Sequence, residues 1–535
     1  MHQLPALPAI DPAIKPEFTD QRSCRQWLAL LPMINVPQAH RELLAALDGL
    51  NRVAIAPLER LKTLEMLRES IAYLQDANAK KYLGKAQPLA PAELAAWQAN
   101  VQMWRVLVVA YQHVLDAALR NDPSVQEHLA LVNHRCLRNL GLAIREHALA
   151  YRSVAAEFWR EMHAYYLASE SGWALRGVKD SQNTHSQASS CTAVYVQALL
   201  LDSIKLSGNS ARHLLWLDSL LDRWANYVTI HPEPIGAAAS AVAVNLDAGG
   251  ILHKSSANPV RARFLDTTQL AKSIAKRIKL LRMGEAPAQL GLGDEFSSDV
   301  CIATLVSCFQ QWCKGGEERS FQRRSASGHA QVVASIDAIY HCIGGKAFEQ
   351  PYVVNEMRSA SIAAIQMFGH TGDSSAEPVA EAASYPSEQW ELFDQSALGF
   401  GLARPAAAGM RIAHNQLLAV CSGDAAAPSV GMVRWLGLSE DDILSAGIRV
   451  LPGLAKAVPM RAVGLSPTGS PQFVATLLLP NMPSLRSEES LITPVGWYKP
   501  GRVVELLQEA QTRRARFDNL LERGPDFERV SFSWI

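Results

Sequence analysis

In the first 230 residues, apolar side chains recur at steps of three and four, the spacing that lines one face of a helix. Such runs extend over 97–118, 58–74 and 217–227, and Pro57 suits the first turn of its helix. Apolar faces of this kind pack together in a helical bundle or array, although a groove for a partner helix is the alternative. The pattern therefore predicts an all-α domain over residues 1–230.

The pattern changes after His231. An alternating stretch at 242–247 predicts a strand, and Asp266 is suited to cap a helix that ends near Gly284. A second helix is expected over about 298–312. The first of these helices carries a row of cations. Such a row is usually a solvated face of the helix; the alternative is a surface that binds an anion or an acidic partner. Residues 231–314 are thus predicted to be a mixed α/β connecting region. The cations of the first helix are Lys272, Lys276, Arg277, Lys279 and Arg282.

From residue 330 onward the apolar period shifts towards two, with turn residues between short runs. Many short strands with regular turns predict an antiparallel barrel or sandwich. The number of expected strands is larger than one small barrel needs, so residues 456–535 are expected to be a β extension or a small second β unit. The fold class is multidomain α+β. The expected strands are 331–339, 390–393, 399–402, 416–421, 431–435, 447–451, 457–463, 473–478, 490–492, 503–507 and 529–532.

The 535 residues contain 51 Lys and Arg and 51 Asp and Glu, so the net charge is zero and any anion site is local. This balance argues against a partner that is a nucleic acid polymer. The eight cysteines form no Cys-x-x-Cys pair, and their scatter predicts a reducing compartment. Cys301, Cys308 and Cys313 are the closest set, and their spacing predicts buried thiols rather than a metal site. No signal peptide and no apolar run of about 20 residues is visible. A cytoplasmic location without direct membrane insertion is therefore expected.

Two short polar stretches carry the candidate chemistry. Arg319 and Arg323 are four residues apart, Arg324 adds a third cation, and Asp394-x-Ser396-x-x-Gly399 follows an expected strand. A guanidinium fork pairs with phosphate oxygens and stacks on purines. The Asp394 carboxylate can accept hydrogen bonds from a guanine edge, Ser396 is a small donor and acceptor, and Gly399 permits a tight turn.

In this order, Arg-x-x-x-Arg and Asp-x-Ser-x-x-Gly resemble the two motifs of the PilZ domain, the bacterial receptor module for cyclic di-GMP. The resemblance covers about 317–451 and implies a β-barrel over 315–455, with cyclic di-GMP as ligand and no cofactor. It implies that Arg319 and Arg323 bind this ligand together with Asp394, Ser396 and Gly399. Arg324 is expected to add a further positive charge to this site. Arg323 and Asp394 are 71 positions apart, so an insertion is expected around 341–388.

The resulting hypothesis is a receptor, not an enzyme, that couples nucleotide binding to an unidentified protein partner of the helical half, with Gly315-Gly316 as a hinge. The alternative is a PilZ-like adaptor that binds no nucleotide and acts in motility, pilus or secretion assemblies. Catalysis would have to rely on His213, on His341-Cys342 or on Ser186, Ser189 and Ser190. None of these stands in a known hydrolase or phosphate-binding motif, so no catalytic residue is assigned.

Overall fold

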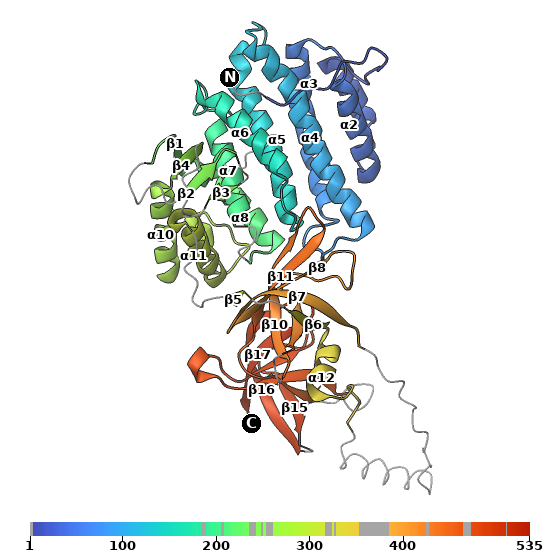
Figure 1. Ribbon diagram of the computed structural model, residues 1–535, viewed down its shortest axis with the longest axis vertical. Coiled ribbons are helices and arrows are strands. Elements are labelled where there is room, and N and C mark those ends of the chain that lie inside the picture. The colour runs from blue at the N-terminus through green and yellow to red at the C-terminus, as the bar shows by residue number, and fades with distance from the viewer. Residues whose placement is uncertain are drawn as a thin grey trace. The chain divides into compact units, whose positions relative to one another are not determined.

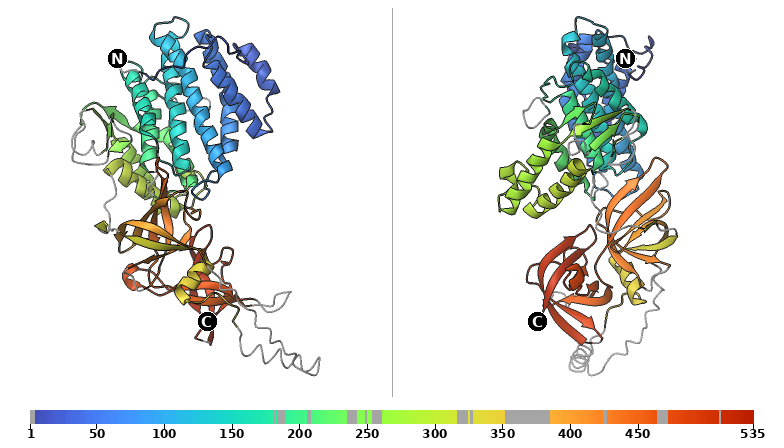
Figure 2. Two further views of the ribbon diagram at one scale, coloured as in Figure 1. Left: turned by 45° about the vertical axis from the view of Figure 1, so that its right-hand side comes forward. Right: turned by 60° about the vertical axis from the view of Figure 1, so that its left-hand side comes forward.

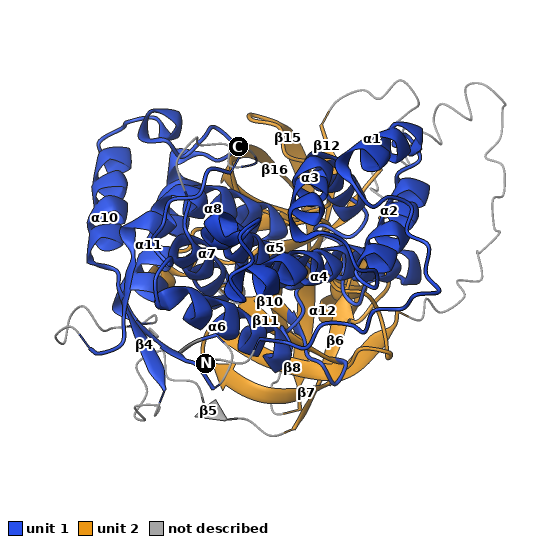
Figure 3. Ribbon diagram, turned by 90° about the horizontal axis from the view of Figure 1, so that it is seen from above, with its two compact units in different colours: residues 1–320, 437–442 blue, residues 321–436, 443–535 orange. Residues whose placement is uncertain are grey.

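The computed structural model divides the chain into two compact units, residues 1–320 with 437–442 and residues 321–436 with 443–535 (Figure 3). Each unit is described separately below. Among the described helices, none combines the length and the apolar character that a membrane span requires. The described residues are 4–180, 182, 189–204, 208–234, 242–247, 250–252, 261–315, 324–325, 328–351, 385–423, 427–463, 472–509 and 511–535.

The first unit begins with eight α-helices that share one apolar core (Figure 1). Two of the predicted apolar runs lie on α3 and α4, and Pro57 is the first residue of α3, as expected. The third run begins on α8 and ends in the short 3-10 helix Ala225–Tyr227 that follows it. The helical N-terminal part is therefore confirmed. The helices are α1 (Gln21–Leu30), α2 (Val36–Leu50), α3 (Pro57–Ala79), α4 (Pro91–Leu119), α5 (Leu129–Leu149), α6 (Ala156–Glu170), α7 (Cys191–Ser203) and α8 (Ala211–Trp224).

A small antiparallel sheet and a helix pair complete this unit. The sheet has the order β1-β4-β2-β3, and α10 and α11 follow it. Thr267 is the N-cap of α10. Asp266, predicted for that position, lies one residue before it and accepts the Thr268 N–H at 2.9 Å. The indole N–H of Trp312 on α11 donates to Leu200 O on α7 at 2.9 Å and ties the pair to the helices. The elements are β1 (Thr229–His231), β2 (Val242–Asn245), β3 (Ile251–Leu252), β4 (Ala262–Asp266), α10 (Thr268–Arg282) and α11 (Ser298–Lys314).

The second unit begins with a sheet of seven strands in the order β5-β7-β6-β9-β10-β11-β8. An additional β7–β8 pairing closes six of them into an antiparallel barrel. The predicted strand 331–339 is wrong beyond Ala334, because the Ser335 hydroxyl accepts the Ala338 N–H and starts helix α12 (Ile336–Gly344). The strands are β5 (Arg324–Ser325), β6 (His329–Ala334), β7 (Ser387–Ser396), β8 (Gly399–Pro405), β9 (Leu417–Ser422), β10 (Ser429–Leu438) and β11 (Ile443–Val450).

A second closed barrel follows, with the order β12-β13-β14-β17-β16-β15. The two barrels lie side by side (Figure 2) and share a buried cluster in which Leu417 and Val430 join Leu477 and Phe527. The expected antiparallel β architecture is thus confirmed, while the long strand β16 was not among the predicted ones. The strands are β12 (Lys456–Ala462), β13 (Val474–Leu479), β14 (Ser490–Thr493), β15 (Val503–Gln508), β16 (Gln511–Arg523) and β17 (Glu528–Trp534).

Candidate functional site

The first of the two motifs is described only at its end. Arg319 and Arg323 lie outside the described residues, and Arg324 is described for its backbone in β5. Strand β5 pairs with β7 so that Arg324 lies opposite Gln395, and Ser325 lies opposite Asp394. The chain directly after the two arginines therefore runs beside the second motif (Figure 1), even though 71 positions separate Arg323 from Asp394.

The second motif forms the β-hairpin between β7 and β8. Ser396 pairs with Gly399 across a two-residue turn. The Ser396 hydroxyl accepts the Leu398 N–H at 3.4 Å and donates to Gly399 O at 3.5 Å, which braces the turn. A Cβ atom on Gly399 would lie 2.6 Å from Ile448 O, so this position requires glycine. The Asp-x-Ser-x-x-Gly pattern thus has a local structural reason as well as a chemical one.

Strand β11 adds an arginine that the sequence analysis did not single out. Arg449 lies directly opposite Gly399 in the β8–β11 ladder. Opposite residues in an antiparallel ladder share one face of the sheet, so Arg449 lies on the same face as Gly399 and Ser396. Phe400 and Ile448, on the other face, are buried. The motif face therefore points out of the barrel.

Two glycines on the same outer face each lie beneath an aromatic ring. A Cβ atom on Gly447 would lie 1.8 Å from the indole nitrogen of Trp435, and one on Gly401 would lie 2.7 Å from the Phe393 ring. Trp435 is half-buried, and Phe393 is 38% exposed. Flat rings on a surface give nucleic acid bases a stacking platform. The face therefore combines stacking surfaces with the arginine and hydroxyl of the motif.

Arginines dominate the charge around Arg449. Glu522 of β16 forms an ion pair with Arg449 and lies 3.9 Å from the Arg529 guanidinium. Burial, reinforced by the neighbouring Arg449 cation, lowers the pKa of Arg434. Three guanidinium groups thus surround one carboxylate. An anionic ligand at this edge would meet excess positive charge, with Glu522 as its competitor.

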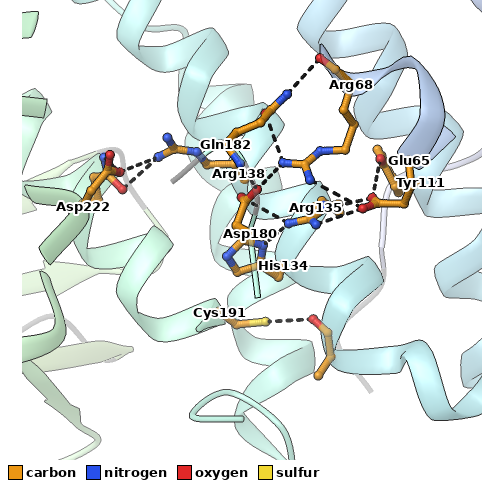
Figure 4. Close-up of polar contacts among 12 residues, drawn as sticks. Glu65, Arg68, Tyr111, His134, Arg135, Arg138, Asp180, Gln182, Cys191 and Asp222 are labelled. Carbon is orange, nitrogen blue, oxygen red and sulfur yellow. Dashed lines mark hydrogen bonds and ion pairs between the residues drawn. The ribbon is translucent and has the colours of Figure 1, made fainter. Parts of the chain in front are cut away.

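A second concentration of charge lies among the helices of the first unit (Figure 4). Arg135 of α5 reaches Glu65 of α3 at 2.9 Å and Asp180 at 3.2 Å, and Arg68 reaches Asp180 at 2.5 Å. The Tyr111 hydroxyl donates to Glu65 at 2.7 Å. Two guanidinium groups therefore match two carboxylates in a buried network.

Electrostatics within this network favour the charged forms. Burial by itself raises the pKa of Asp180, but Arg135 and Arg68 outweigh it and lower that pKa to about 2. Burial likewise raises the pKa of Glu65, but the hydrogen bond and the charge of Arg135 outweigh it, so the net effect is a lowered pKa. Since the charges already satisfy one another, the cluster fits a structural link between α3, α5 and Asp180 better than a site for an added anion.

The residues considered for catalysis have local structural contacts. His213 Nδ1 lies 2.7 Å from the Ser210 hydroxyl at the start of α8, and Ser190 caps α7 by accepting the Ala193 N–H. The Cys342 and Cys421 sulfurs are 3.5 Å apart as free thiols. Cys301, Cys308 and Cys313 are buried, as predicted, and so are Cys24, Cys136 and Cys191. Ser186 lies outside the described residues.

Two protein-family models match this chain. One, described as the N-terminal domain of the cyclic-di-GMP receptor FimW, matches residues 22–234. The other, the FimW C-terminal beta-barrel domain, matches residues 460–535. A curated relative, the cyclic-di-GMP receptor FimW of Pseudomonas aeruginosa, is 22% identical over 538 residues, which is 92% of this chain and 87% of the relative.

These matches confirm the similarity to a cyclic-di-GMP receptor with a helical N-terminal half and a C-terminal β-barrel. Both motifs fall between the two segments that the family models match. The assignment of Arg319, Arg323, Arg324, Asp394, Ser396 and Gly399 as ligand-binding residues therefore stays a prediction.

Proposed function

We propose that this chain is a cytoplasmic, non-enzymatic receptor for cyclic di-GMP that binds its ligand on the outer face of the first barrel. The observation that carries the proposal is the β5–β7 pairing, which brings the chain after Arg319 and Arg323 next to Asp394. The name of the similar receptor from Pseudomonas aeruginosa supports the choice of ligand.

Each residue on this face has a role that follows from its chemistry. Arg319, Arg323 and Arg324 would hold the two phosphodiester groups and stack on a guanine. The half-buried Asp394 would accept N–H donors of a guanine edge. Arg449 would contribute a further cation. The glycine at 399 would allow the ligand to approach the backbone closely.

Binding would be coupled to a protein partner of the helical half. Helix α11 ends at Lys314, and its C-cap Gly315 has a left-handed φ of 76° that terminates the helix shortly before Arg319. A ligand can shift the arrangement of the chain only if it prefers one arrangement. Small-angle scattering with and without saturating cyclic di-GMP tests this part: an unchanged profile contradicts the coupling and leaves the binding proposal intact.

Calorimetric titration with cyclic di-GMP tests the binding proposal. The wild type is expected to bind with micromolar or tighter affinity, and Arg319→Ala/Arg323→Ala is expected to lose about 100-fold or more, because two charge-assisted contacts are removed. Arg22→Ala/Arg25→Ala removes two exposed arginines from α1 and is the matched control.

Each outcome of this titration has a distinct meaning. Binding that survives in the Arg319→Ala/Arg323→Ala variant would mean that the chain is a receptor whose site lies elsewhere. Absence of binding to the wild type would contradict the receptor and favour the adaptor that binds no nucleotide.

A further inference from the structure

A surface groove of about 430 Å³ lies between α10 and α11, which pack side by side (Figure 1). Its floor is apolar and includes Ile278, Val306 and Phe309, all half-buried. Met283, at the end of α10, is 69% exposed at its margin. The volume is within the range of a few hundred Å³ that is typical of ligand pockets, so the groove can take up several apolar side chains.

Cations surround this floor. Lys279 and Arg282 line the groove, and the Lys314 ammonium lies 5.9 Å from the centre of the Phe309 ring. Helix α10 contains no Asp or Glu. Within the described part of the chain, neither Lys279 nor Arg282 takes part in an ion pair, and both residues are exposed.

Not every cation of α10 belongs to this surface. Arg277 donates to Leu290 O at 3.1 Å and stacks on the Trp224 ring, where it serves the unit's own packing. Lys279 and Arg282 are three residues apart and therefore lie on the same face of the helix. The positive charge at the groove thus comes from Lys279 and Arg282, which both line it.

The composition of the groove disfavours two other occupants. A guanine base needs acceptors for its N–H donors, and the side chains lining the groove include no carboxylate or amide. A membrane-binding helix presents its apolar side chains outermost, whereas Ile278 and Phe309 form the floor of a hollow. A concave apolar surface with charged edges instead has the features of a helix-binding groove.

We propose that this groove docks an amphipathic helical segment of a partner protein, with apolar side chains one turn apart and Asp or Glu on both sides of them. The apolar side chains enter the floor over Phe309 and Ile278. The flanking carboxylates meet Lys279 and Arg282, and this charge match selects the partner and sets its orientation. The groove belongs to the first unit, and the proposal does not rest on nucleotide binding.

The test uses the full-length chain and a labelled model peptide that has Leu at i, i+3, i+4 and i+7 and Glu at the flanking positions. A second peptide carries Lys in place of every Glu. At low salt, fluorescence anisotropy is expected to show the Glu peptide binding about tenfold more tightly than the Lys peptide. Lys279→Glu/Arg282→Glu is expected to reverse this preference, and Phe309→Ala is expected to weaken both peptides.

Lys80→Glu/Lys81→Glu reverses two exposed charges at the end of α3 and is the matched control, expected to bind as the wild type does. A thermal melt verifies that each variant is folded. Equal binding of the two peptides, no binding of either, or an unchanged preference in Lys279→Glu/Arg282→Glu would overturn the proposal. So would anionic vesicles that bind the chain through Lys279 and Arg282 while neither peptide binds.

Discussion

Arg449 and Gly399 lie directly opposite each other in the ladder between β11 and β8, on the outer face of the first barrel. This places a guanidinium group at the hairpin that carries Ser396. Glu522 already pairs with that guanidinium, so any anion at this face must compete with an internal carboxylate.

This competition predicts opposite effects of two substitutions on cyclic di-GMP affinity. Glu522→Gln removes the competing charge and is expected to tighten binding several-fold, while Arg449→Ala is expected to weaken it about tenfold. Calorimetric titration measures both. Glu505→Gln is the matched control, because Glu505 pairs with Arg461 and Arg514 elsewhere on the second barrel. If all three variants bind like the wild type, Arg449 has no part in the site.

Gly447→Ala is expected to destabilise the first barrel. Its Cβ atom would overlap the Trp435 indole, so the ring must move or the strands must separate, at a cost of about 2 kcal/mol in the free energy of unfolding. Denaturant unfolding followed by circular dichroism measures this cost. Gly423→Ala is the control, because a Cβ atom there meets nothing within 4 Å. Equal stability of the two variants would show that Trp435 does not pack on Gly447.

Asp180→Asn is expected to destabilise the helical unit by about 3 kcal/mol at pH 7, because Arg135 and Arg68 lose a buried counter-charge. The folded chain holds the pKa of Asp180 at about 2, below the ordinary 3.8, so the wild type loses this contribution as the pH falls through that interval. The difference in the free energy of unfolding between wild type and variant should therefore shrink below pH 3.8.

Unfolding experiments between pH 2 and pH 7, a range that covers the interval between the two pKa values, measure that difference in the free energy of unfolding. Asp294→Asn changes an exposed loop residue and should leave the stability unchanged across the range. A difference that stays constant with pH would mean that Asp180 does not supply the charge that Arg135 and Arg68 need.

Asp526 is expected to have the opposite pH dependence. Burial raises its pKa from 3.8 to about 6 while its carboxylate accepts the Leu417 N–H. The folded state then binds the proton more tightly than the unfolded state, so this group lowers stability as the pH rises from about 4 to about 6. Asp526→Asn keeps an acceptor for Leu417 and removes the buried charge.

Above pH 6 the Asp526→Asn variant should therefore be more stable than the wild type by about 1 kcal/mol, a modest gain because Asp526 is only half-buried and water screens its charge. Below pH 4 the two should have the same stability. Unfolding measured at pH 3.5 and pH 8 tests this expectation. If the fold instead needs the Asp526 carboxylate in its ionised form, the variant will be less stable than the wild type at pH 8.

Much of the secondary structure could be predicted because its signals are local. The apolar period over 97–118 and the proline at 57 were sufficient to locate two long helices, since both signals act within a few turns of the chain. Strand β16 escaped prediction because Arg513, Arg514 and Arg516 mask the alternation that buries Ala515 and Phe517. The helix at 336–344 was missed because an apolar run cannot by itself distinguish a strand from a short helix.

The sequence by itself therefore determined the helical first half, the antiparallel second half and the residue types able to bind a phosphodiester. The tertiary structure alone decided which of those residues meet. The pairing of Ser325 with Asp394 and that of Arg449 with Gly399 join distant segments, and the register of a ladder depends on the burial of whole strands. No local pattern in the chain encodes that register, because it arises from packing across the barrel.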